Sequence, residues 1–187
     1  MSYPLITRRL VIEPLVEADV AEFLAYRRDP EVARWQSWTP DYTAADARRL
    51  IAGQPTTVLP GPGSWLQLAI RARDGSPLHG DVAIHRLDGQ PDTFEIGVTL
   101  APQSQGLGLA TEAVATVLDF LFAEGHAHRV VAFCDSRNDR VHRLLERVGM
   151  RHESRLVEGE FFKDEWTTLD GYAILATEHA PADVIDQ

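Results

Sequence analysis

Two glycines stand at the expected mouth of a helix, in the segment Gln105-Gly-Leu-Gly-Leu-Ala110. The segment follows a predicted strand that ends at Leu100 and opens a helix that runs from about Gly108. Glycine lets the backbone approach a ligand closely, and the unpaired N–H groups of a first helical turn attract phosphate oxygens. The spacing therefore predicts a phosphate site over residues 105–111, with a plain strand-to-helix turn as the alternative.

Two common phosphate motifs do not fit this segment. No Gly-Lys-Ser/Thr follows the glycines, as a P-loop requires, and the spacing differs from the three-glycine dinucleotide fingerprint. The pattern thus excludes these two nucleotide sites and leaves another phosphate-bearing ligand.

Strands and helices must position this segment. Alternating patterns and turn dipeptides predict strands at 10–14, 65–73, 78–87, 93–100, 130–134, 150–157 and 166–176. Helical spacing predicts helices at 17–28 and 43–52, one from about 108 that Gly125 terminates, and one that Gly149 closes. We expect residues 158–164 to form a loop. A meander followed by a helical crossover indicates an α/β or α+β fold with a mixed sheet.

The length and composition indicate one domain. The chain has 187 residues, of which 44% are apolar, so it can build a sizeable core. We place the domain at residues 1–178 and a frayed tail at 179–187.

The charge balance narrows the class of partner. The 28 acidic and 18 basic residues give a net charge of -10, which opposes binding to nucleic acids. A negative field favours cationic acceptors such as amines, although solubility alone is the simpler explanation of the charge. The N-terminus lacks a signal-peptide core and no run of about 18 apolar residues could span a bilayer, so we expect a cytoplasmic protein without membrane contact.

The cysteine and histidines do not suggest metal or thiol chemistry. Cys134 is the single cysteine and lies in an apolar run, where we expect a buried structural thiol with a raised pKa. The histidines lack metal-ligand spacing, so no metal is expected.

Four segments, in the same order, resemble the GNAT superfamily of acyl-CoA transferases and within it the RimJ/RimL-like N-acetyltransferases. Gln105, Gly108 and Ala110 match the family pattern Gln/Arg-x-x-Gly-x-Gly/Ala. The other similar segments are residues 94–98, 138–150 and 166–175. The resemblance spans nearly the whole chain and implies a mixed, mostly antiparallel sheet, flanked by helices and splayed between its fourth and fifth strands, where acetyl-CoA enters.

The resemblance also implies which residues hold acetyl-CoA. Thr111 and the backbone amides of the glycine segment would bind the pyrophosphate, namely Gln105, Gly106, Leu107, Gly108, Leu109 and Ala110. Backbone groups of Ile96, Gly97 and Val98 would bind the pantetheine arm. Asn138 would contact its far end, and Arg143 would meet the adenosine phosphate unless it is simply an exposed helical arginine.

Acetyl transfer requires an amine that has lost its proton, because an ammonium has a pKa of about 10. Glu95, on the same strand face as Gly97, is the first candidate base, directly or through water. Glu160, in the expected loop, is the second. Each has a plain solvated glutamate as its alternative. The amide of Val98 would donate to the thioester oxygen.

The sequence departs from the family pattern at two positions. Val141 stands where many relatives have serine, and Met150 replaces a phenylalanine. The helix that Gly149 closes also lacks the tyrosine acid of some relatives, so proton return to the thiolate would use water or no dedicated acid. We expect direct attack in a ternary complex.

The acceptor and the oligomeric state remain open at this stage. Aromatic candidates for contact with an amine are Trp35, Trp38, Tyr42 and Phe161. The acceptor is either a protein N-terminus or a small-molecule amine. The rival hypotheses are a non-catalytic acyl-CoA sensor and a nucleotide site unrelated to CoA. The sequence does not decide between a monomer and a homodimer.

Overall fold

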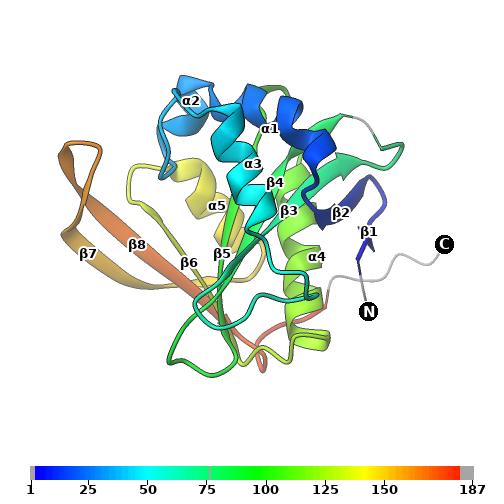
Figure 1. The fold of residues 1–187 in the computed structure, drawn as a ribbon. Coiled ribbons are helices and arrows are strands. Elements are labelled where there is room, and N and C mark those ends of the chain that lie inside the picture. The colour runs from blue at the N-terminus through cyan, green and yellow to red at the C-terminus, as the bar shows by residue number, and fades with distance from the viewer. Residues whose placement is uncertain (1–2, 76, 182–187) are drawn as a thin grey trace.

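The computed structural model describes residues 3–75 and 77–181, in which eight strands form one sheet (Figure 1). Their order is β1-β2-β3-β4-β5-β6-β8-β7, and all neighbours are antiparallel except β5 and β6, which are parallel. The strands are β1 Leu5–Ile6, β2 Leu10–Pro14, β3 Trp65–Ala72, β4 Leu78–Arg86, β5 Thr93–Leu100, β6 Arg129–Asp135, β7 Arg151–Phe162 and β8 Glu165–Leu175. The expected mixed, mostly antiparallel sheet is confirmed.

Helices lie on both faces of this sheet (Figure 1). They are α1 Val20–Arg27, α2 Pro30–Ala33, α3 Ala44–Ala52, α4 Leu109–Ala123 and α5 Asp139–Arg147, with 3-10 turns at Glu17–Asp19 and Pro102–Ser104. Thr43 and Asp46 form the expected capping box at the start of α3. None of the described helices is both long and apolar enough to cross a membrane.

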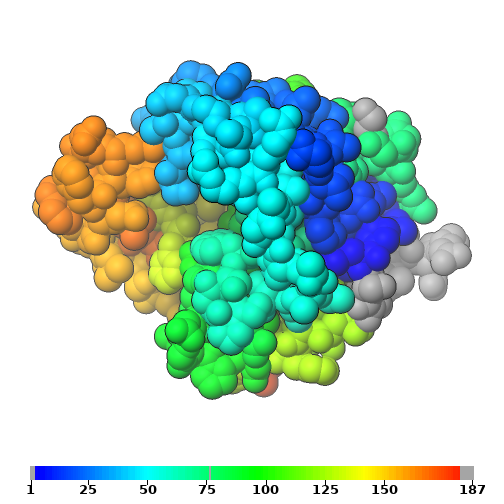
Figure 2. Space-filling model, viewed as in Figure 1, coloured from blue at the N-terminus to red at the C-terminus, as the bar shows by residue number. Residues whose placement is uncertain are grey.

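Strand alternation divides the sheet into an apolar face and a mixed face. Leu66, Ile84 and Ile96 point to the side of α4, where they share one buried core with Val114 and Leu118. The intervening residues of β3, β4 and β5 face the opposite side, which α1, α2 and α3 cover (Figure 2). The face under α4 is therefore apolar, whereas the other face combines a second buried cluster with polar groups.

The sheet opens between its two parallel strands. β5 and β6 pair only at Thr93 with Arg129, Phe94 with Val130 and Glu95 with Val131. From Ile96 onward the two strands have no paired residues. The backbone of β5 on that side is therefore left without a strand partner, at the place where the family resemblance implied a splay.

The main error of the sequence analysis lies in the terminal hairpin. The expected loop at 158–164 is wrong, because β7 continues to Phe162 and only Lys163 and Asp164 form the turn. A bulge between Leu156 and Glu160 breaks the alternation on which the sequence prediction relied. The short elements α2 and β1 were not predicted, and residues 182–187 of the expected tail lie outside the described residues.

Candidate active site

A cavity of about 1050 Å³ lies on the mixed face of the sheet. Its floor is built by alternate residues of three neighbouring strands: Trp65, Gln67, Asp81, Ala83, Glu95, Gly97 and Thr99. Its walls come from α1, the segment after α2, the end of α3 and the β7–β8 hairpin. Of the candidate residues, Glu95, Ile96, Gly97, Val98, Trp35, Trp38 and Glu160 line this one space.

A narrower cavity of about 100 Å³ occupies the splay between β5 and β6. Its wall includes Asn138, Val141 and Leu145 around α5. Gly97 and Cys134 are among the residues that line both cavities. The two spaces therefore meet at the splay, and a long ligand that enters past α5 would reach the larger cavity there.

The glycine segment has the backbone geometry of an anion site at the start of α4. Gly106 and Gly108 have φ of 75° and 77°, which few other residues adopt at low cost. The first helical bond runs from the Glu112 N–H to the Gly108 carbonyl, so the N–H groups of residues 109–111 have no helical partner. A Cβ on Gly108 would lie 3.5 Å from the nearest side-chain atom, Nη2 of Arg9.

Three arginines that sequence reasoning missed surround this segment. Arg147 donates to the Thr111 hydroxyl at 3.3 Å, and Arg140 donates to the side-chain oxygen of Gln105. Arg9 donates to the Leu107 carbonyl at 2.9 Å from the opposite side. The candidate Arg143 lies on α5 between the first two and is exposed. Arg140 and Arg147 are seven residues apart, so the sequence could have placed them on the same face of a helix. The position of Arg9 beside the glycine segment depends on how the sheet folds.

Asn138 has a structural contact as well as a place beside the splay. Its side chain caps α5 by accepting a hydrogen bond from the Val141 N–H at 3.4 Å. The side-chain amide group keeps its own donors for a ligand in the narrow cavity.

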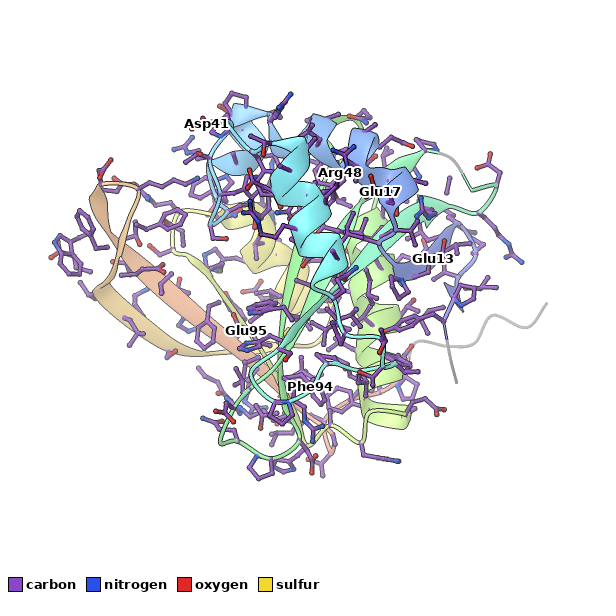
Figure 3. The ribbon with its side chains drawn as sticks, viewed as in Figure 1. Glu13, Glu17, Asp41, Arg48, Phe94 and Glu95 are labelled. Atoms are coloured by element: carbon purple, nitrogen blue, oxygen red, sulfur yellow. The ribbon has the colours of Figure 1, made fainter. Side chains whose placement is uncertain are left out.

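Glu95 is half-buried on β5, in the lower part of Figure 3. His85 lies opposite it on β4, with Nδ1 at 3.4 Å from a Glu95 carboxylate oxygen. Trp65 stacks on the His85 ring with centroids 4.4 Å apart. Sequence reasoning missed His85, although the pairing of two strands joined by a short turn could have revealed it. The stacked indole and the carboxylate hold the imidazole beside the candidate base.

The β7–β8 hairpin supplies a second carboxylate. Glu160 and Phe162 both line the large cavity. Phe161 is not among the lining residues, is 59% exposed and packs against Trp166. The prediction of Phe161 is therefore wrong by one position, and Phe162 lines the cavity instead. Neighbouring side chains of a strand point to opposite faces.

The opposite wall contains an aromatic cluster around a buried cation. The Arg27 guanidinium carbon lies 3.7 Å from the Trp38 ring centroid, 4.1 Å from that of Phe23 and 5.1 Å from that of Tyr42. Trp35 and Trp38 line the cavity, whereas Tyr42 packs behind them and is not among the lining residues. Tyr42 therefore supports the wall, and Arg27 is a wall residue that the sequence did not single out.

Asp81 faces Arg27 from β4 and is almost fully buried. Its carboxylate accepts hydrogen bonds from the Tyr26 hydroxyl and the Gln67 amide. Burial and the charge of Asp81 raise the pKa of Tyr26 well above its usual value. The tyrosine therefore stays protonated as a donor to Asp81 at neutral pH.

Cys134 lies at the junction of the two cavities but is poorly suited to nucleophilic chemistry. Burial, with the charges of Asp170 and Asp135, raises the pKa of its thiol to about 12. Its sulfur is 3.9 Å from the His142 ring nitrogens. Because the thiolate is the nucleophile, a thiol with this pKa is inert near neutral pH, as the sequence analysis expected.

The comparisons with known proteins all give acetyltransferases as relatives of this chain. A family model described as an acetyltransferase (GNAT) domain matches residues 9–151. The uncharacterized N-acetyltransferase YnaD of Bacillus subtilis (strain 168) is 28% identical over 183 residues, which cover 92% of this chain and 96% of that protein.

Solved structures share the fold over almost all of the chain. A GNAT-family acetyltransferase from Bacillus anthracis has a TM-score of 0.82 at 25% identity and covers 93% of this chain and 99% of its own. Spermidine N-acetyltransferase from Vibrio cholerae, in complex with CoA and spermine, has a TM-score of 0.80 at 17% identity, with coverages of 92% and 98%. Mycobacterium smegmatis RimJ, in complex with CoA-disulfide, has a TM-score of 0.78 at 23% identity, with coverages of 90% and 83%.

Proposed function

Because the chain belongs to the GNAT acetyltransferase family, in its RimJ/RimL-like branch, we propose that it transfers the acetyl group of acetyl-CoA to a primary amine by direct attack in a ternary complex. The observation that carries this proposal is the junction of two cavities at the splay between β5 and β6. The narrow cavity lies between Val114 of α4 and Val141 and Leu145 of α5, and the other cavity is large enough for an acceptor.

The residues around the glycine segment suit the acidic end of acetyl-CoA. Free N–H groups at the start of α4 would bind the pyrophosphate, aided by the positive end of the helix dipole. Arg140 and Arg147 project from α5 beside the same segment and would add charge-assisted hydrogen bonds. We therefore extend the expected phosphate site at residues 105–111 by these two arginines, and Arg143 takes the outer position.

The unpaired backbone of β5 would bind the pantetheine arm and place the thioester at the junction. Ile96 and Gly97 would hold the arm as a strand partner would, and the Val98 amide would donate to the thioester oxygen as negative charge develops there. Acetyl-CoA supplies the activated acetyl group. Asn138 would contact the arm beside the start of α5, where its side chain lines the narrow cavity.

Glu95 is the residue that we assign to removal of the acceptor proton, through water or directly. Glu95 lies on the cavity floor, two residues before Gly97 and on the same face of β5. Glu160 lines the cavity from β7. His85 would keep the Glu95 carboxylate in place. The departing thiolate needs no dedicated acid on this chain, because its pKa of about 8.5 makes it a fair leaving group.

Two acceptor classes are compatible with the family. The Vibrio cholerae relative is named for spermidine, and the Mycobacterium smegmatis relative is a RimJ protein. A small polyamine or a protein N-terminus would each bring a primary amine to the cavity. Trp35, Trp38 and Phe162 would contact either one through their rings.

The test is an acceptor screen with acetyl-CoA, in which thiol release and a gain of about 42 Da on the acceptor are both measured, the mass being that of acetyl replacing hydrogen. We expect release only in the presence of a suitable amine, and no displacement of CoA by millimolar ATP. Binding of CoA without release for any amine would favour a sensor. Displacement by ATP would favour a nucleotide site.

A further inference from the structure

The end of the β7–β8 hairpin projects beyond the rest of the sheet. β8 pairs with β6 over Leu169 to Leu175, whereas residues 157–168 pair only with each other in the described sheet. These residues form a two-stranded arm, whose tip lies on the side of α2 (Figure 1). Glu160 and Phe162 of the arm line the large cavity. The position of this wall of the cavity therefore depends on contacts that the arm makes outside the sheet.

A lysine in the turn of the arm contacts another wall of the same cavity. The Lys163 ammonium donates hydrogen bonds to the backbone carbonyls of Ala33 and Trp38, the second at 2.8 Å. Residues 33–38 form a wall segment, from which Trp35, Gln36, Ser37 and Trp38 line the large cavity. One ammonium group therefore binds both ends of the wall segment and connects it to the arm.

The residue type suits this contact. Lys163 is the only lysine of the sequence, and arginine supplies all its other Lys or Arg positions. An ammonium has three donors on one nitrogen and can serve two carbonyls that converge on a point, whereas a planar guanidinium matches the paired oxygens of a carboxylate. Burial lowers the pKa of the Lys163 ammonium, which is partly removed from water at this contact.

The wall segment also borders the splay. Trp35 and Gln36 line both the large and the narrow cavity. The Trp38 indole N–H donates to the Arg27 carbonyl at 3.1 Å, which attaches the end of the segment to α1. The segment therefore stands at the junction of the two cavities, where we place the thioester. Closing such a site against water favours transfer to the bound acceptor over hydrolysis.

We propose that Lys163 is a positioning residue for acetyl transfer, because it holds the arm and the wall segment together across the acceptor cavity. This inference rests on the acetyltransferase function proposed above. With the contact formed, both walls are held against the acceptor and water is kept from the thioester. Exchange of its two hydrogen bonds for water would separate the walls and admit the acceptor.

A second polar contact of the arm provides a matched control. Glu165 accepts a hydrogen bond from Arg137 at 2.7 Å, and Arg137 also pairs with Asp135 at the end of β6. This contact joins the arm to its own side of the splay and not to the wall segment. Arg137→Met should therefore loosen the arm without separating it from the wall segment.

Hydrogen exchange of the full chain tests the contact without any acceptor. In Lys163→Met, the amides of residues 34–38 should exchange on the order of 10-fold faster than in wild type, as for loss of a hydrogen bond to a charged group. Lys163→Arg should restore part of the protection, and Arg137→Met should keep the wild-type rates there. Unchanged rates in Lys163→Met, or the same acceleration in Arg137→Met, would overturn the proposal. Unchanged exchange in β3, β4 and β5 shows that the variants are folded.

Kinetics test the positioning role. Thiol release is measured with acetyl-CoA alone and with the acceptor that the screen identifies. In Lys163→Met, kcat/KM for the acceptor should fall, and hydrolysis per acetyl group transferred should rise, each on the order of 10-fold. KM for acetyl-CoA should change little, because its proposed phosphate site lies at the start of α4. Arg137→Met should stay close to wild type in all three quantities.

The outcomes separate this inference from the proposed function. Wild-type kinetics in Lys163→Met would overturn the positioning role and leave the acetyltransferase function in place. If wild type acetylates no amine, the proposed function fails instead. Hydrogen exchange of the CoA-loaded protein then decides by itself whether Lys163 joins the two walls.

Discussion

At the scale of single residues, the proposed role of Glu95 as the base depends on how its carboxylate is placed. Its carboxylate is half-buried on the cavity floor, and His85 holds it from the neighbouring strand while Trp65 stacks on His85. The three residues occupy one row across β3, β4 and β5, since Trp65 pairs with His85 and His85 with Glu95. A carboxylate in such a row on a sheet is held more firmly than a carboxylate on a loop.

Replacing Glu95 by glutamine should lower kcat/KM by about 100- to 10,000-fold at neutral pH, the range typical for loss of a general base. The deficit should shrink as the pH approaches the pKa of the acceptor ammonium, because more of the amine then lacks its proton without help. Initial rates of thiol release between pH 6 and pH 10 measure both effects.

Glu160→Gln is the matched control for this variant, since Glu160 lines the same cavity from the opposite wall. Its expected loss is less than 10-fold. A larger loss in Glu160→Gln than in Glu95→Gln would assign the base to the hairpin instead. Equal small losses would mean that water alone accepts the proton.

At the scale of elements, the proposed CoA pyrophosphate site lies at the start of α4. Gly108 lies at φ 77°, where any side chain is strained by roughly 1–2 kcal/mol, and a large one would also occupy the approach to the free N–H groups. Gly108→Phe should therefore weaken CoA binding at least 10-fold, as measured by calorimetry. Gly75→Phe is the control, because Gly75 has a φ of 90° in a turn of the sheet with no atom near its missing Cβ. Unchanged CoA affinity in Gly108→Phe would contradict a phosphate site here.

An ion pair between Arg155 on β7 and Asp170 on β8 links the two strands of the hairpin. Two hydrogen bonds from Arg155, joined by His152, lower the pKa of Asp170 from 3.8 to about 2. A carboxylate with a lowered pKa stabilises the fold fully above pH 3.8, and this contribution is lost as the pH falls through about 2.

Arg155→Met should therefore reduce the free energy of unfolding at pH 7, and its deficit relative to wild type should narrow below pH 4. Urea unfolding followed by tryptophan fluorescence at several pH values measures the difference. A deficit that stays constant down to the lowest pH at which the protein folds would show that Arg155 acts by packing rather than through the Asp170 charge.

At the scale of the whole molecule, the splay leaves two parts of the sheet joined by a short paired segment. β5 and β6 share pairs only from Thr93 to Glu95, while α4 and α5 stand on either side of the opening. A ligand that contacts both helices would replace the missing strand pairing. It should bind the folded chain and have no site on the unfolded one.

CoA at 100 times its Kd should therefore stabilise the protein by about 2.7 kcal/mol. For a chain of this length the expected rise in Tm is roughly 5–10 °C, since each kcal/mol shifts it by about 2–4 °C. Differential scanning calorimetry with CoA and, separately, with ATP measures the shift. No rise with CoA, or the same rise with ATP, would contradict a CoA-specific splay.

The amino-acid sequence determined most of the local structure. The alternation in 65–100 predicted β3, β4 and β5 to within a residue or so, and the capping pair Thr43 and Asp46 predicted the start of α3. The glycine segment predicted a helix from about Gly108, and α4 begins at Leu109 with Gly108 as its N-cap. These features depend on neighbours within a few residues, so local periodicity and turn chemistry are sufficient to reveal them.

The tertiary structure decided which distant side chains meet. Arg27 and Asp81 are far apart in the sequence, as are Arg147 and Thr111, and no local pattern encodes such pairs. The bulge in β7 likewise decided that Phe162, and not Phe161, lines the cavity. Local sequence determines whether a segment has the periodicity of a helix or of a strand. Register, bulges and packing then determine which of its residues face the site.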